Sequence, residues 1–390
     1  MKIAVFFGSR NPEHDVSIIT GQLIISGLKE LGHEVIPVYI SKDGSWYVGE
    51  ELGNLDFFKK ENYRLELKNY EGFNLQLNTN GKMIFKKQSM FNSTELVADF
   101  AFPAIHGQNG EDGTIQGMFE MLNVPYAGCD VPASANAMDK VTTKLIYQRF
   151  NIPTTKFTFF HTNEWLTKKD EIMNEIGKSL TFPLFVKPSR LGSSIGIAKV
   201  NSKEDLEFAI EVALHYDDKV LVEEGIEDLK DLTVCLIGND EPIISKIQES
   251  TYTKDFFSYE DKYINEGGAQ IGNAQKKMII PADLDEKTTE EIKQQAKDVY
   301  RIFGCSGIAR VDFLYDRTFK KYYANEINTL PGTIYQHLWK QSGIELKELL
   351  TKLIEYGKEK HDKKQKLTYT FESEILKKSN SNKLKLKGNN

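Results

Sequence analysis

Three side chains near the C-terminal end of the chain have the types and spacing of a divalent-metal site. Glu326 and Asn328 lie two residues apart in a predicted strand, so both side chains leave the same face of it. Asp312 lies in an apolar run that predicts a neighbouring strand. Two carboxylates and an amide oxygen suit Mg²⁺ or Mn²⁺, which also bind phosphate oxygens, so the pattern indicates ATP chemistry. A surface hairpin with solvated acidic residues stays open as the alternative.

A glycine- and serine-rich loop, Pro188–Ser194, lies where a phosphate could bind. Glycine lets the backbone approach a ligand closely, and backbone N–H groups together with the hydroxyls of Ser193 and Ser194 can hold phosphate oxygens. Lys187, at the end of the preceding predicted strand, would add a positive charge. An ordinary solvated turn explains the loop equally well from the sequence alone.

Two other positions are weaker candidates for nucleotide contacts. Lys140 lies early in a predicted helix and could reach a phosphate, although a solvated helix lysine is the commoner case. The stretch Leu221–Ile226 ends a predicted strand, where backbone groups could hydrogen-bond an adenine.

Two polar loops follow predicted strands in the N-terminal region. One is Gly8–Asp15 and the other is His106–Thr114. Ligands of open α/β sheets bind outside the carboxyl ends of the strands, so both loops could border a site. Glu13 could meet an ammonium group there, beside a helix N-terminus that favours an anion. Asp15 as a plain helix cap and His106 as a structural histidine remain the alternatives.

Composition limits the class of protein. A chain of 390 residues with 40% hydrophobic and 27% charged residues allows two or three ordinary globular domains. The net charge of -6 gives no basic footprint, so we expect no nucleic-acid partner. Three widely spaced cysteines fit a reducing compartment, and no apolar run is long enough to cross a bilayer. We therefore expect a cytoplasmic protein without a membrane partner.

The pattern of apolar residues predicts the elements that must position these side chains. A strand at Ile3–Phe7, a helix at Asp15–Leu31 and a strand at Val35–Ile40 form a βαβ unit. The polar stretch Tyr252–Gln275 predicts a long functional loop. Further predicted elements are strands at Leu96–Ile105, Phe182–Val186, Ile195–Val200, Val220–Glu223, Leu232–Ile237, Ile308–Tyr315 and Tyr322–Asn328, and helices at Ala133–Phe150, Leu284–Phe303 and Gly343–Tyr356.

The motifs become specific when they are taken in order along the chain. The order is His106–Gly113 (HGQNGEDG), Met138–Lys140 (MDK), Lys187–Ser194 (KPSRLGSS), the pair Lys262-Tyr263, Arg310–Asp312 (RVD) and Asn325–Gly332 (NEINTLPG). In this order the chain resembles the D-alanine–D-alanine ligases of the ATP-grasp superfamily over about residues 1–356.

The resemblance implies an α/β (α+β) fold in which two domains grip ATP. Residues 1–126 would form a doubly wound N-terminal substrate domain and residues 127–222 the central ATP-grasp domain. Residues 223–360 would form the C-terminal catalytic domain, followed by a lysine-rich tail at 361–390. The implied reaction uses ATP to activate one D-alanine as an acyl phosphate, which the amine of a second D-alanine attacks. The product serves peptidoglycan synthesis, and the family likeness implies a homodimer.

The resemblance also implies a role for individual residues. The metal ligands for two Mg²⁺ or Mn²⁺ ions would be Asp312, Glu326 and Asn328, and the ATP contacts would come from Lys140, Lys187, Ser194, Glu223, Glu224, Ile226, Asp231 and Lys262. Arg310 and the backbone N–H of Gly332 would form the oxyanion site. Glu13, with His106 beside it, would meet the ammonium of the first D-alanine. A hydrogen-bonded trio of Glu13, Ser193 and Tyr263 would close the long loop over the site.

Three positions depart from the family pattern. Glu224 stands where a lysine is usual, and Asp231 stands where a glutamate binds ribose. His337 stands where a serine holds the carboxylate of the second substrate. We expect D-alanine to remain the acceptor, with the imidazole donating a hydrogen bond in place of the serine. A related ligase with D-lactate, D-serine or another amino acid as acceptor, and a non-catalytic nucleotide-binding module, stay open.

Overall fold

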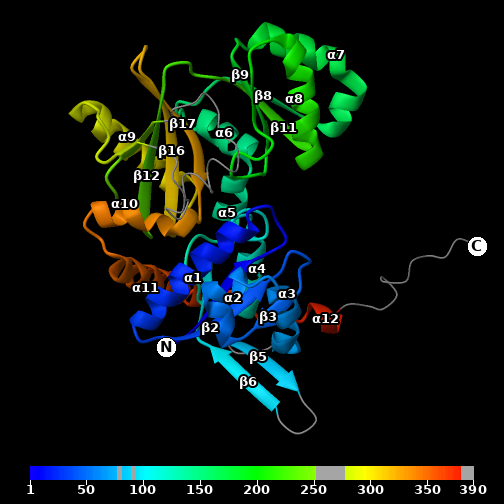
Figure 1. The fold of residues 1–390 in the computed structure, drawn as a ribbon, viewed down its shortest axis with the longest axis vertical. Coiled ribbons are helices and arrows are strands. Elements are labelled where there is room, and N and C mark those ends of the chain that lie inside the picture. The colour runs from blue at the N-terminus through cyan, green and yellow to red at the C-terminus, as the bar shows by residue number, and fades with distance from the viewer. Residues whose placement is uncertain (77–80, 89–92, 252–276, 379–390) are drawn as a thin grey trace, which may run out of the picture.

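The computed structural model describes residues 1–76, 81–88, 93–251 and 277–378. One end of the molecule is built on the sheet that contains the N-terminal strand, and the other end on two antiparallel sheets (Figure 1). This mixed α/β arrangement confirms the predicted fold class. The predicted loop at Tyr252–Gln275, with Lys262 and Tyr263, lies outside the described residues.

The N-terminal sheet has the strand order β3-β2-β1-β7, with β1 parallel to both β2 and β7. Its strands are β1 (Lys2–Gly8), β2 (Glu34–Ile40), β3 (Trp46–Val48) and β7 (Phe100–Pro103). Helix α1 (His14–Glu30) joins β1 to β2 and confirms the predicted βαβ unit.

Both faces of β1 are buried, which explains its continuous apolar sequence. Ile3 and Phe7 pack on one face with α1, whereas Ala4 and Phe6 pack on the other face with α4 (Thr114–Leu122). Four short helical segments follow β3, namely the 3-10 turn Glu50–Gly53, α2 (Leu55–Lys59), α3 (Tyr63–Glu66) and the 3-10 turn Leu67–Tyr70.

The single strand predicted at Leu96–Ile105 is wrong, because the chain changes sheets at Asp99. β6 (Ser93–Ala98) pairs with β5 (Met83–Gln88), which pairs with β4 (Phe73–Gln76), in a separate small sheet. Only β7 joins β1. The Asp99 carboxylate accepts a hydrogen bond from the backbone N–H of Lys2, which fixes the transfer point. Periodicity within one apolar run cannot reveal such a change of partner.

The single helix predicted at Ala133–Phe150 is likewise two helices, α5 (Val131–Met138) and α6 (Lys140–Arg149). Asp139 has extended backbone angles between them, and its carboxylate accepts from the N–H of Thr142 as the N-cap of α6. The break makes Lys140 the first residue of a helix. The N-terminal end of a helix carries partial positive charge, so the break makes the position of Lys140 more favourable for binding an anion.

The second sheet is antiparallel, in the order β10-β9-β11-β8. Its strands are β8 (Phe157–His161), β9 (Leu184–Pro188), β10 (Ala198–Val200) and β11 (Lys219–Glu224). Helices α7 (Thr162–Ser179) and α8 (Lys203–Tyr216) pack their apolar side chains against this sheet (Figure 1). The loop between β9 and β10 is the glycine- and serine-rich segment singled out above.

The third sheet has the order β15-β14-β12-β16-β17, and β13 also pairs with β12. Its strands are β12 (Leu229–Gly238), β13 (Ile243–Ile244), β14 (Gln248–Thr251), β15 (Lys277–Ile279), β16 (Gly307–Asp316) and β17 (Lys321–Asn328). The two strands predicted before and at the acidic motif are confirmed as β16 and β17. Helix α9 (Glu286–Ile302) packs its apolar face against the sheet.

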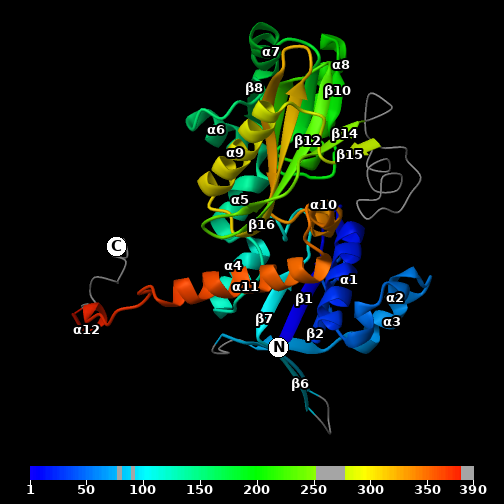
Figure 2. The ribbon, with the colours of Figure 1, turned by 90° about the vertical axis from the view of Figure 1, so that its left-hand side faces the viewer.

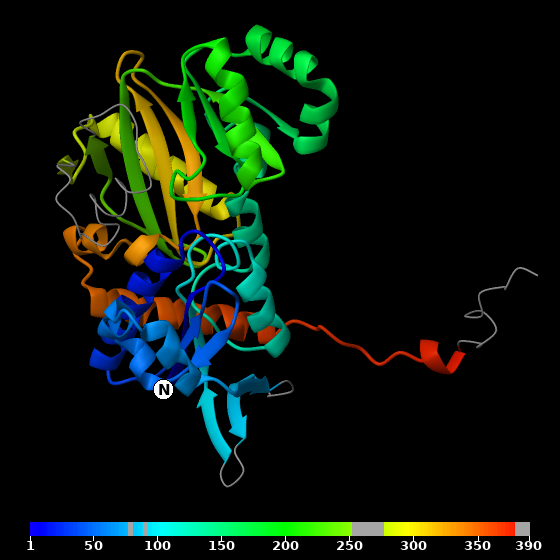
Figure 3. The same cartoon turned by 45° about the vertical axis from the view of Figure 1, so that its right-hand side comes forward.

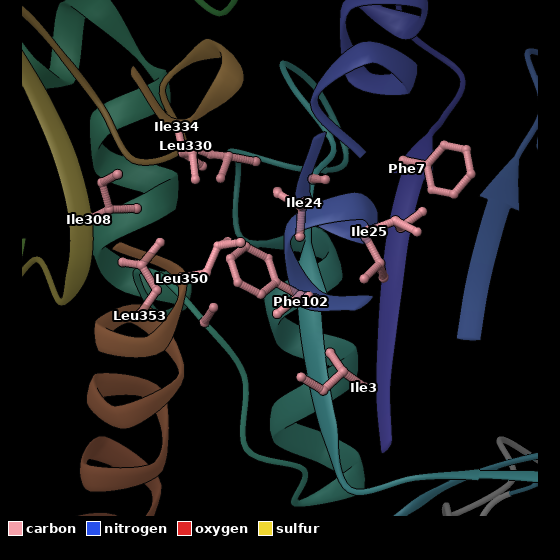
Figure 4. Close-up of a cluster of buried hydrophobic side chains, with 14 of the residues drawn as sticks. Ile3, Phe7, Ile24, Ile25, Phe102, Ile308, Leu330, Ile334, Leu350 and Leu353 are labelled. Atoms are coloured by element: carbon pink, nitrogen blue, oxygen red, sulfur yellow. The ribbon is translucent and has the colours of Figure 1, made fainter. Parts of the chain in front are cut away.

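The C-terminal helices bring the chain back to its N-terminal end. After α10 (Gln336–Gln341), α11 (Leu346–Gln365) lies across the molecule beside α1 (Figure 2). Leu350 and Leu353 of α11 share one core with Ile24 of α1 and with Leu330 (Figure 4). The N-terminal and C-terminal parts of the chain therefore pack against each other in one core.

The helix predicted at Gly343–Tyr356 is thus longer than expected and runs to Gln365. Beyond it the chain extends away from the body to the short helix α12 (Ile375–Lys378) (Figure 3). Among the described residues, every helix is too short or too polar to span a bilayer.

Candidate active site

A cleft of about 1060 Å³ lies between the two antiparallel sheets and the loops of the N-terminal sheet. All candidate residues that the structure describes line this cleft: Glu13, His106, Lys140, Lys187, Ser193, Ser194, Glu223, Glu224, Ile226, Asp231, Arg310, Asp312, Glu326, Asn328, Gly332 and His337. Lys262 and Tyr263 lie outside the described residues. Residues more than 300 positions apart in the sequence thus meet at one site.

The lysines lie on the side formed by the second sheet. Lys187, on β9, forms an ion pair with Glu223, on the neighbouring strand β11. Lys140 donates to the carbonyl oxygen of Leu191 at 2.7 Å, and its Nζ lies 3.9 Å from Glu326 Oε2. Lys140 therefore links the second sheet to the acidic strand β17 across the cleft.

A third lysine, Lys144, was missed by the sequence analysis. It lies one turn after Lys140 on α6, is almost completely buried, and its Nζ is 2.6 Å from Glu223 Oε2. The four-residue spacing from Lys140, on the same helix face, was the available signal. Burial acts to raise the pKa of Glu223, but the two lysines outweigh it and hold that pKa well below its usual range.

The loop after β9 is fixed at its beginning. Ser189 donates to the Asp139 carboxylate at 2.8 Å, and the backbone N–H of Arg190 donates to Asp217. Ser193 and Ser194 both have left-handed backbone angles, with φ of 57° and 59°. Such angles are unfavourable for residues other than glycine, so the surrounding contacts determine how this loop faces the cleft.

Two glycines of different loops make room for Glu13. A Cβ at Gly192 would lie 2.6 Å from Glu13 Oε2, and one at Gly107 would lie 2.3 Å from it. The Ser193 hydroxyl donates to the other carboxylate oxygen. Glu13 itself is only 5% exposed. The glycines of both motifs are thus required for close approach to one carboxylate.

Glu111 is a second carboxyl group, next to Glu13. It belongs to the His106–Gly113 motif, but the sequence analysis predicted no role for it. Its oxygens accept from the backbone N–H groups of Gly107, at 2.8 Å, and Leu330, at 3.2 Å. Burial, followed by the neighbouring Glu13 carboxylate, raises the pKa of Glu111 to about 8. Glu111 therefore holds a proton at neutral pH while it ties the first glycine loop to the segment before Gly332.

Both ring nitrogens of His106 have hydrogen-bond partners. Nδ1 donates to the carbonyl oxygen of Leu330 at 3.0 Å, so the neutral ring accepts at Nε2 from the Thr20 hydroxyl at 2.7 Å. Burial lowers the pKa of His106 to about 4. Thr20 in turn accepts from the N–H of Thr333. The structure thus places His106 as a support for the Leu330–Thr333 segment.

The acidic side of the cleft is a row of residues across the third sheet. Thr233, Asp312 and Glu326 lie directly opposite one another on β12, β16 and β17, so their side chains share one face. Thr233 donates to Asp312 Oδ1 at 2.9 Å, and Asn328 Nδ2 donates to Oδ2 at 3.2 Å. The shared face predicted for Glu326 and Asn328 from their spacing agrees with this arrangement, whereas the cross-strand register adds Asp312 and Thr233 to that face.

Arg310 lies on the same face and neutralises part of this acidic charge. Its Nε and Nη2 atoms donate to the Asp312 carboxylate, with a shortest distance of 2.6 Å, and Nη2 lies 3.6 Å from Glu326 Oε1. The guanidinium also lies over the Tyr335 ring, 5.1 Å from its centroid. Burial raises the pKa of Asp312, and the Glu326 carboxylate adds to this, although Arg310 acts in the opposite direction.

The described residues offer a donor set that fits divalent metal ions. Asp312 and Glu326 supply carboxylate oxygens and Asn328 an amide oxygen, all on one face of the sheet. Hard cations such as Mg²⁺ prefer these oxygens and complete their coordination with water or phosphate. Within the described ranges, groups of three or more His, Cys, Asp or Glu side chains suited to a metal ion are absent. The site therefore depends on the amide and on oxygens from the substrate.

The segment after Gly332 is a left-handed turn. Thr333, Ile334 and Tyr335 have φ of 49°, 48° and 51°, which is rare for β-branched residues. The turn leads into α10, where His337 Nε2 donates to the side-chain oxygen of Gln248 at 2.7 Å. Gln248, on β14, is directly opposite Thr233 and was not singled out from the sequence. It extends the polar row of the third sheet to His337.

The residues expected near the base and ribose differ in how their side chains are used. Glu224 accepts from the backbone N–H of Thr181 at 3.0 Å and lies 3.8 Å from Lys156, so its carboxylate is engaged outside the base position. Ile226 follows it along the cleft wall. Asp231 lies on β12 opposite Ser250, facing the cleft.

Two antiparallel sheets that hold a cleft between them, with lysines on one side and acidic residues on the other, define an enzyme of the ATP-grasp class. Two family models match the chain, "D-ala D-ala ligase N-terminus" over residues 2–129 and "D-ala D-ala ligase C-terminus" over residues 146–355. The chain belongs to the D-alanine–D-alanine ligase family, which confirms the resemblance seen in its motifs.

Individual relatives support the same assignment. The D-alanine–D-alanine ligase of Thermosipho melanesiensis is 37% identical over 379 residues, covering 97% of this chain and 98% of the relative. The structure of the D-alanine–D-alanine ligase from Coxiella burnetii superposes with a TM-score of 0.77 at 28% identity, covering 94% and 96% of the two chains. The D-Ala:D-Ser ligase from Enterococcus faecalis superposes with a TM-score of 0.70 at 30% identity, covering 91% and 99%.

Proposed function

We propose that this protein joins two D-alanines to D-alanyl-D-alanine, with conversion of ATP to ADP and phosphate, for peptidoglycan synthesis. The family assignment supports the reaction. The observation that carries it to this chain is the convergence of Lys187, Arg310 and the Asp312–Glu326 pair with Glu13 in one cleft. That cleft offers positive charge for phosphates, oxygen ligands for metal ions and a buried anion for a substrate ammonium.

The first D-alanine binds with its ammonium toward Glu13. The buried carboxylate is held by the Ser193 hydroxyl and enclosed by two glycines, so it presents a fixed negative charge. Because the Glu13 carboxylate is buried, its ion pair with the ammonium of D-alanine is strong and directional. The family resemblance implies that Tyr263 would complete this trio and that Lys262 would contact the phosphates; both lie outside the described residues. Closure would exclude water from the acyl phosphate.

ATP lies along the second sheet. Lys140, Lys187 and the Ser194 backbone and hydroxyl contact the phosphates, and Asp231 accepts from the ribose. The backbone groups of Glu223, Glu224 and Ile226 hydrogen-bond the adenine, a role that leaves the Glu224 carboxylate free to stay with Thr181.

Asp312, Glu326 and Asn328 would hold two Mg²⁺ or Mn²⁺ ions, which would supply positive charge to offset that of the phosphates. The protein supplies the rest of the electrostatics through Arg310 and the N–H of Gly332, which stabilise the oxyanion of the tetrahedral intermediate. The Asp312 and Tyr335 contacts of Arg310 fix its guanidinium before substrate arrives.

His337 binds the carboxylate of the acceptor. Because an amide oxygen can only accept, the contact with Gln248 requires a proton on Nε2 of His337. A hydrogen bond from the ring to a carboxylate then needs a second proton, on Nδ1. The acceptor is therefore bound best by the doubly protonated ring, and its KM rises as pH rises.

D-Serine is the alternative acceptor, and two observations support it. His337 replaces the serine of the family pattern, and the D-Ala:D-Ser ligase of Enterococcus faecalis superposes on this chain at an identity comparable to that of the D-alanine–D-alanine ligases of known structure. The chemistry up to the acyl phosphate is the same for both acceptors. Only the competition between D-alanine and D-serine for the second site separates them.

The test is a phosphate-release assay with Mg²⁺ and ATP, in which single amino acids and pairs are supplied and the products are identified by mass spectrometry. D-Alanine alone should give phosphate and D-alanyl-D-alanine in equal amounts, whereas L-alanine should give neither. A mixed product as the main species with D-serine would assign the alternative acceptor. Binding of ATP without turnover with any amino acid would contradict a ligase and leave a nucleotide-binding module.

We also propose that the enzyme acts in the cytoplasm as a homodimer, as the family likeness implies. Sedimentation equilibrium of the purified chain tests the dimer. A single species at the monomer mass of 44.5 kDa at micromolar concentration would contradict it.

A further inference from the structure

Three buried charged side chains form a compact cluster behind the lysine side of the cleft. Glu223 lies between Lys144, with Oε2 to Nζ at 2.6 Å, and Lys187, which pairs with Oε1. The side chains of Lys144 and Glu223 are each 2% exposed, whereas that of Lys187 is 12% exposed. Lys187 and Glu223 line the cleft, and Lys144 does not. The exposed end of the cluster is therefore the Lys187 ammonium.

Lys144 is held by a complete set of partners. It donates to the hydroxyls of Thr154, at 2.8 Å, and Thr155, at 2.9 Å, and lies 5.5 Å from the centroid of the Phe157 ring. Thr155 in turn donates to Glu223 Oε2 at 2.7 Å. Burial lowers the pKa of Lys144, but the Glu223 carboxylate opposes this. All the contacts of Lys144 face the protein interior, so it does not line the cleft.

The charge count of the cluster differs from that of a simple ion pair. Lys187 and Glu223 alone would be neutral together, and the carboxylate would cancel most of the field that Lys187 directs into the cleft. Two ammonium groups and one carboxylate leave one unit of positive charge. Because charges interact strongly in a buried environment, this excess is felt at the exposed lysine rather than screened by water.

We propose that Lys144 is a positioning residue for ATP: by sharing the charge of Glu223 it leaves Lys187 anchored yet still positive toward the phosphates. Glu223 fixes the direction of the Lys187 ammonium, and Lys144 offsets the charge that this anchoring would otherwise remove. The inference rests on the proposed binding of ATP phosphates by Lys187 and adds a residue outside the cleft to it.

The test compares Lys144→Met with the double variant Lys144→Met/Glu223→Gln by calorimetric titration with ATP and with ADP, without amino acids. Lys144→Met leaves a neutral pair and should weaken ATP binding by roughly ten- to a hundredfold, the range for a charged hydrogen bond. Glutamine in the double variant keeps an oxygen for Lys187 but removes the negative charge. ATP binding should then return to within roughly threefold of the wild type.

A purely structural role predicts the opposite order. If Lys144 only fills space and anchors the cluster, removing a second anchor cannot restore binding, so a double variant as weak as Lys144→Met overturns the inference. Lys144→Met with unchanged ATP binding overturns it as well. Absence of ATP binding by the wild-type protein would instead contradict the proposed function.

Lys230→Met is a matched control for the loss of a buried lysine. Lys230 pairs with the buried Glu249 at 3.0 Å and is 13% exposed, yet neither residue lines the cleft. Lys230→Met should lower the midpoint of thermal unfolding without changing the affinity for ATP. Thermal unfolding of Lys144→Met gives the same check on folding, and a folded variant with normal ATP affinity would count against the inference.

Discussion

The two sides of the cleft hold charges in the same way but with opposite signs. On the second sheet, one carboxylate, Glu223, lies between two lysines, Lys144 and Lys187. On the third sheet, one guanidinium, Arg310, lies between two carboxylates, Asp312 and Glu326. Each cluster is anchored by internal ion pairs and keeps one unit of excess charge, positive for phosphates on one side and negative for cations on the other.

The two clusters differ in depth. The lysine cluster has its carboxylate and one lysine at 2% exposure, whereas the acidic cluster is 14–26% exposed. A charge inside the lysine cluster is therefore held almost entirely by its partners, and losing one partner is costly. The acidic cluster is more open to the cleft. Its excess charge is accessible, and we expect its substitutions to act on chemistry more than on folding.

Glu326→Gln should have the largest effect and tests the acidic cluster directly. The change removes the excess negative charge of the acidic cluster and one proposed ligand of the metal ions, and Mg²⁺ tolerates the loss of a ligand poorly. The variant should show no turnover. The wild-type enzyme should turn over only when a divalent metal is supplied. Glu241→Gln, at an exposed site paired with Arg301, is the control and should retain full activity. Phosphate release by Glu326→Gln at the wild-type rate would remove this residue from the site.

Arg310→Ala should have the next largest effect, because it separates anchoring from transition-state stabilisation. We expect kcat to fall by roughly 10²–10³-fold, as for the loss of an oxyanion donor. ATP affinity should change much less, since the charge that Arg310 stabilises develops during the reaction. Calorimetry and steady-state kinetics measure the two quantities. A variant that keeps kcat but loses ATP would make Arg310 a nucleotide ligand, like the lysines opposite.

His337→Ser should act only at the acceptor side, beyond the end of the acidic row. The acceptor KM of the wild type, corrected for the free-amine fraction of D-alanine, should rise with pH, and this rise should be absent in His337→Ser. The variant's acceptor KM should also differ from that of the wild type by roughly three- to tenfold. Gln248→Met, which removes the partner of the imidazole, should disturb acceptor KM while leaving ATP affinity unchanged. Identical acceptor KM, pH profile and acceptor preference in His337→Ser would mean that the ring only packs.

Glu111→Gln should have the smallest effect and concerns stability. The pKa of Glu111 is raised from 4.5 to about 8, so the folded protein keeps a proton there that the unfolded chain has lost. Its stabilising contribution is complete below about pH 4.5 and is lost as pH rises toward 8.

The thermal cost of Glu111→Gln should therefore shrink between about pH 5 and pH 9, by roughly 2–4 °C. Glu175→Gln, on the exposed face of α7, is the matched control and should show no such trend. A cost that stays constant or grows with pH would show that Glu111 is ionised in the folded protein.

The sequence by itself determined the order of the motifs, the fold class and the shared face of Glu326 and Asn328. These follow from local rules, because side chains two apart on a strand leave the same face wherever that strand lies. It also predicted that the loops at Pro188–Ser194 and His106–Thr114 border a site, although not that Gly107 and Gly192 enclose the same carboxylate.

Only the tertiary structure decided which groups share a charge. Lys144 and Glu223 are 79 residues apart, Gln248 and His337 are 89 apart, and Glu111 meets the N–H of Leu330 across 219 residues. The break at Asp99 was hidden for the same reason, since it depends on a hydrogen bond from Lys2, 97 residues away. The break at Asp139 has a local cause, an N-cap aspartate, which the apolar pattern does not register. Burial and pairing are properties of the folded surroundings, so the charge left over at each side of the cleft could not be obtained from spacing along the chain.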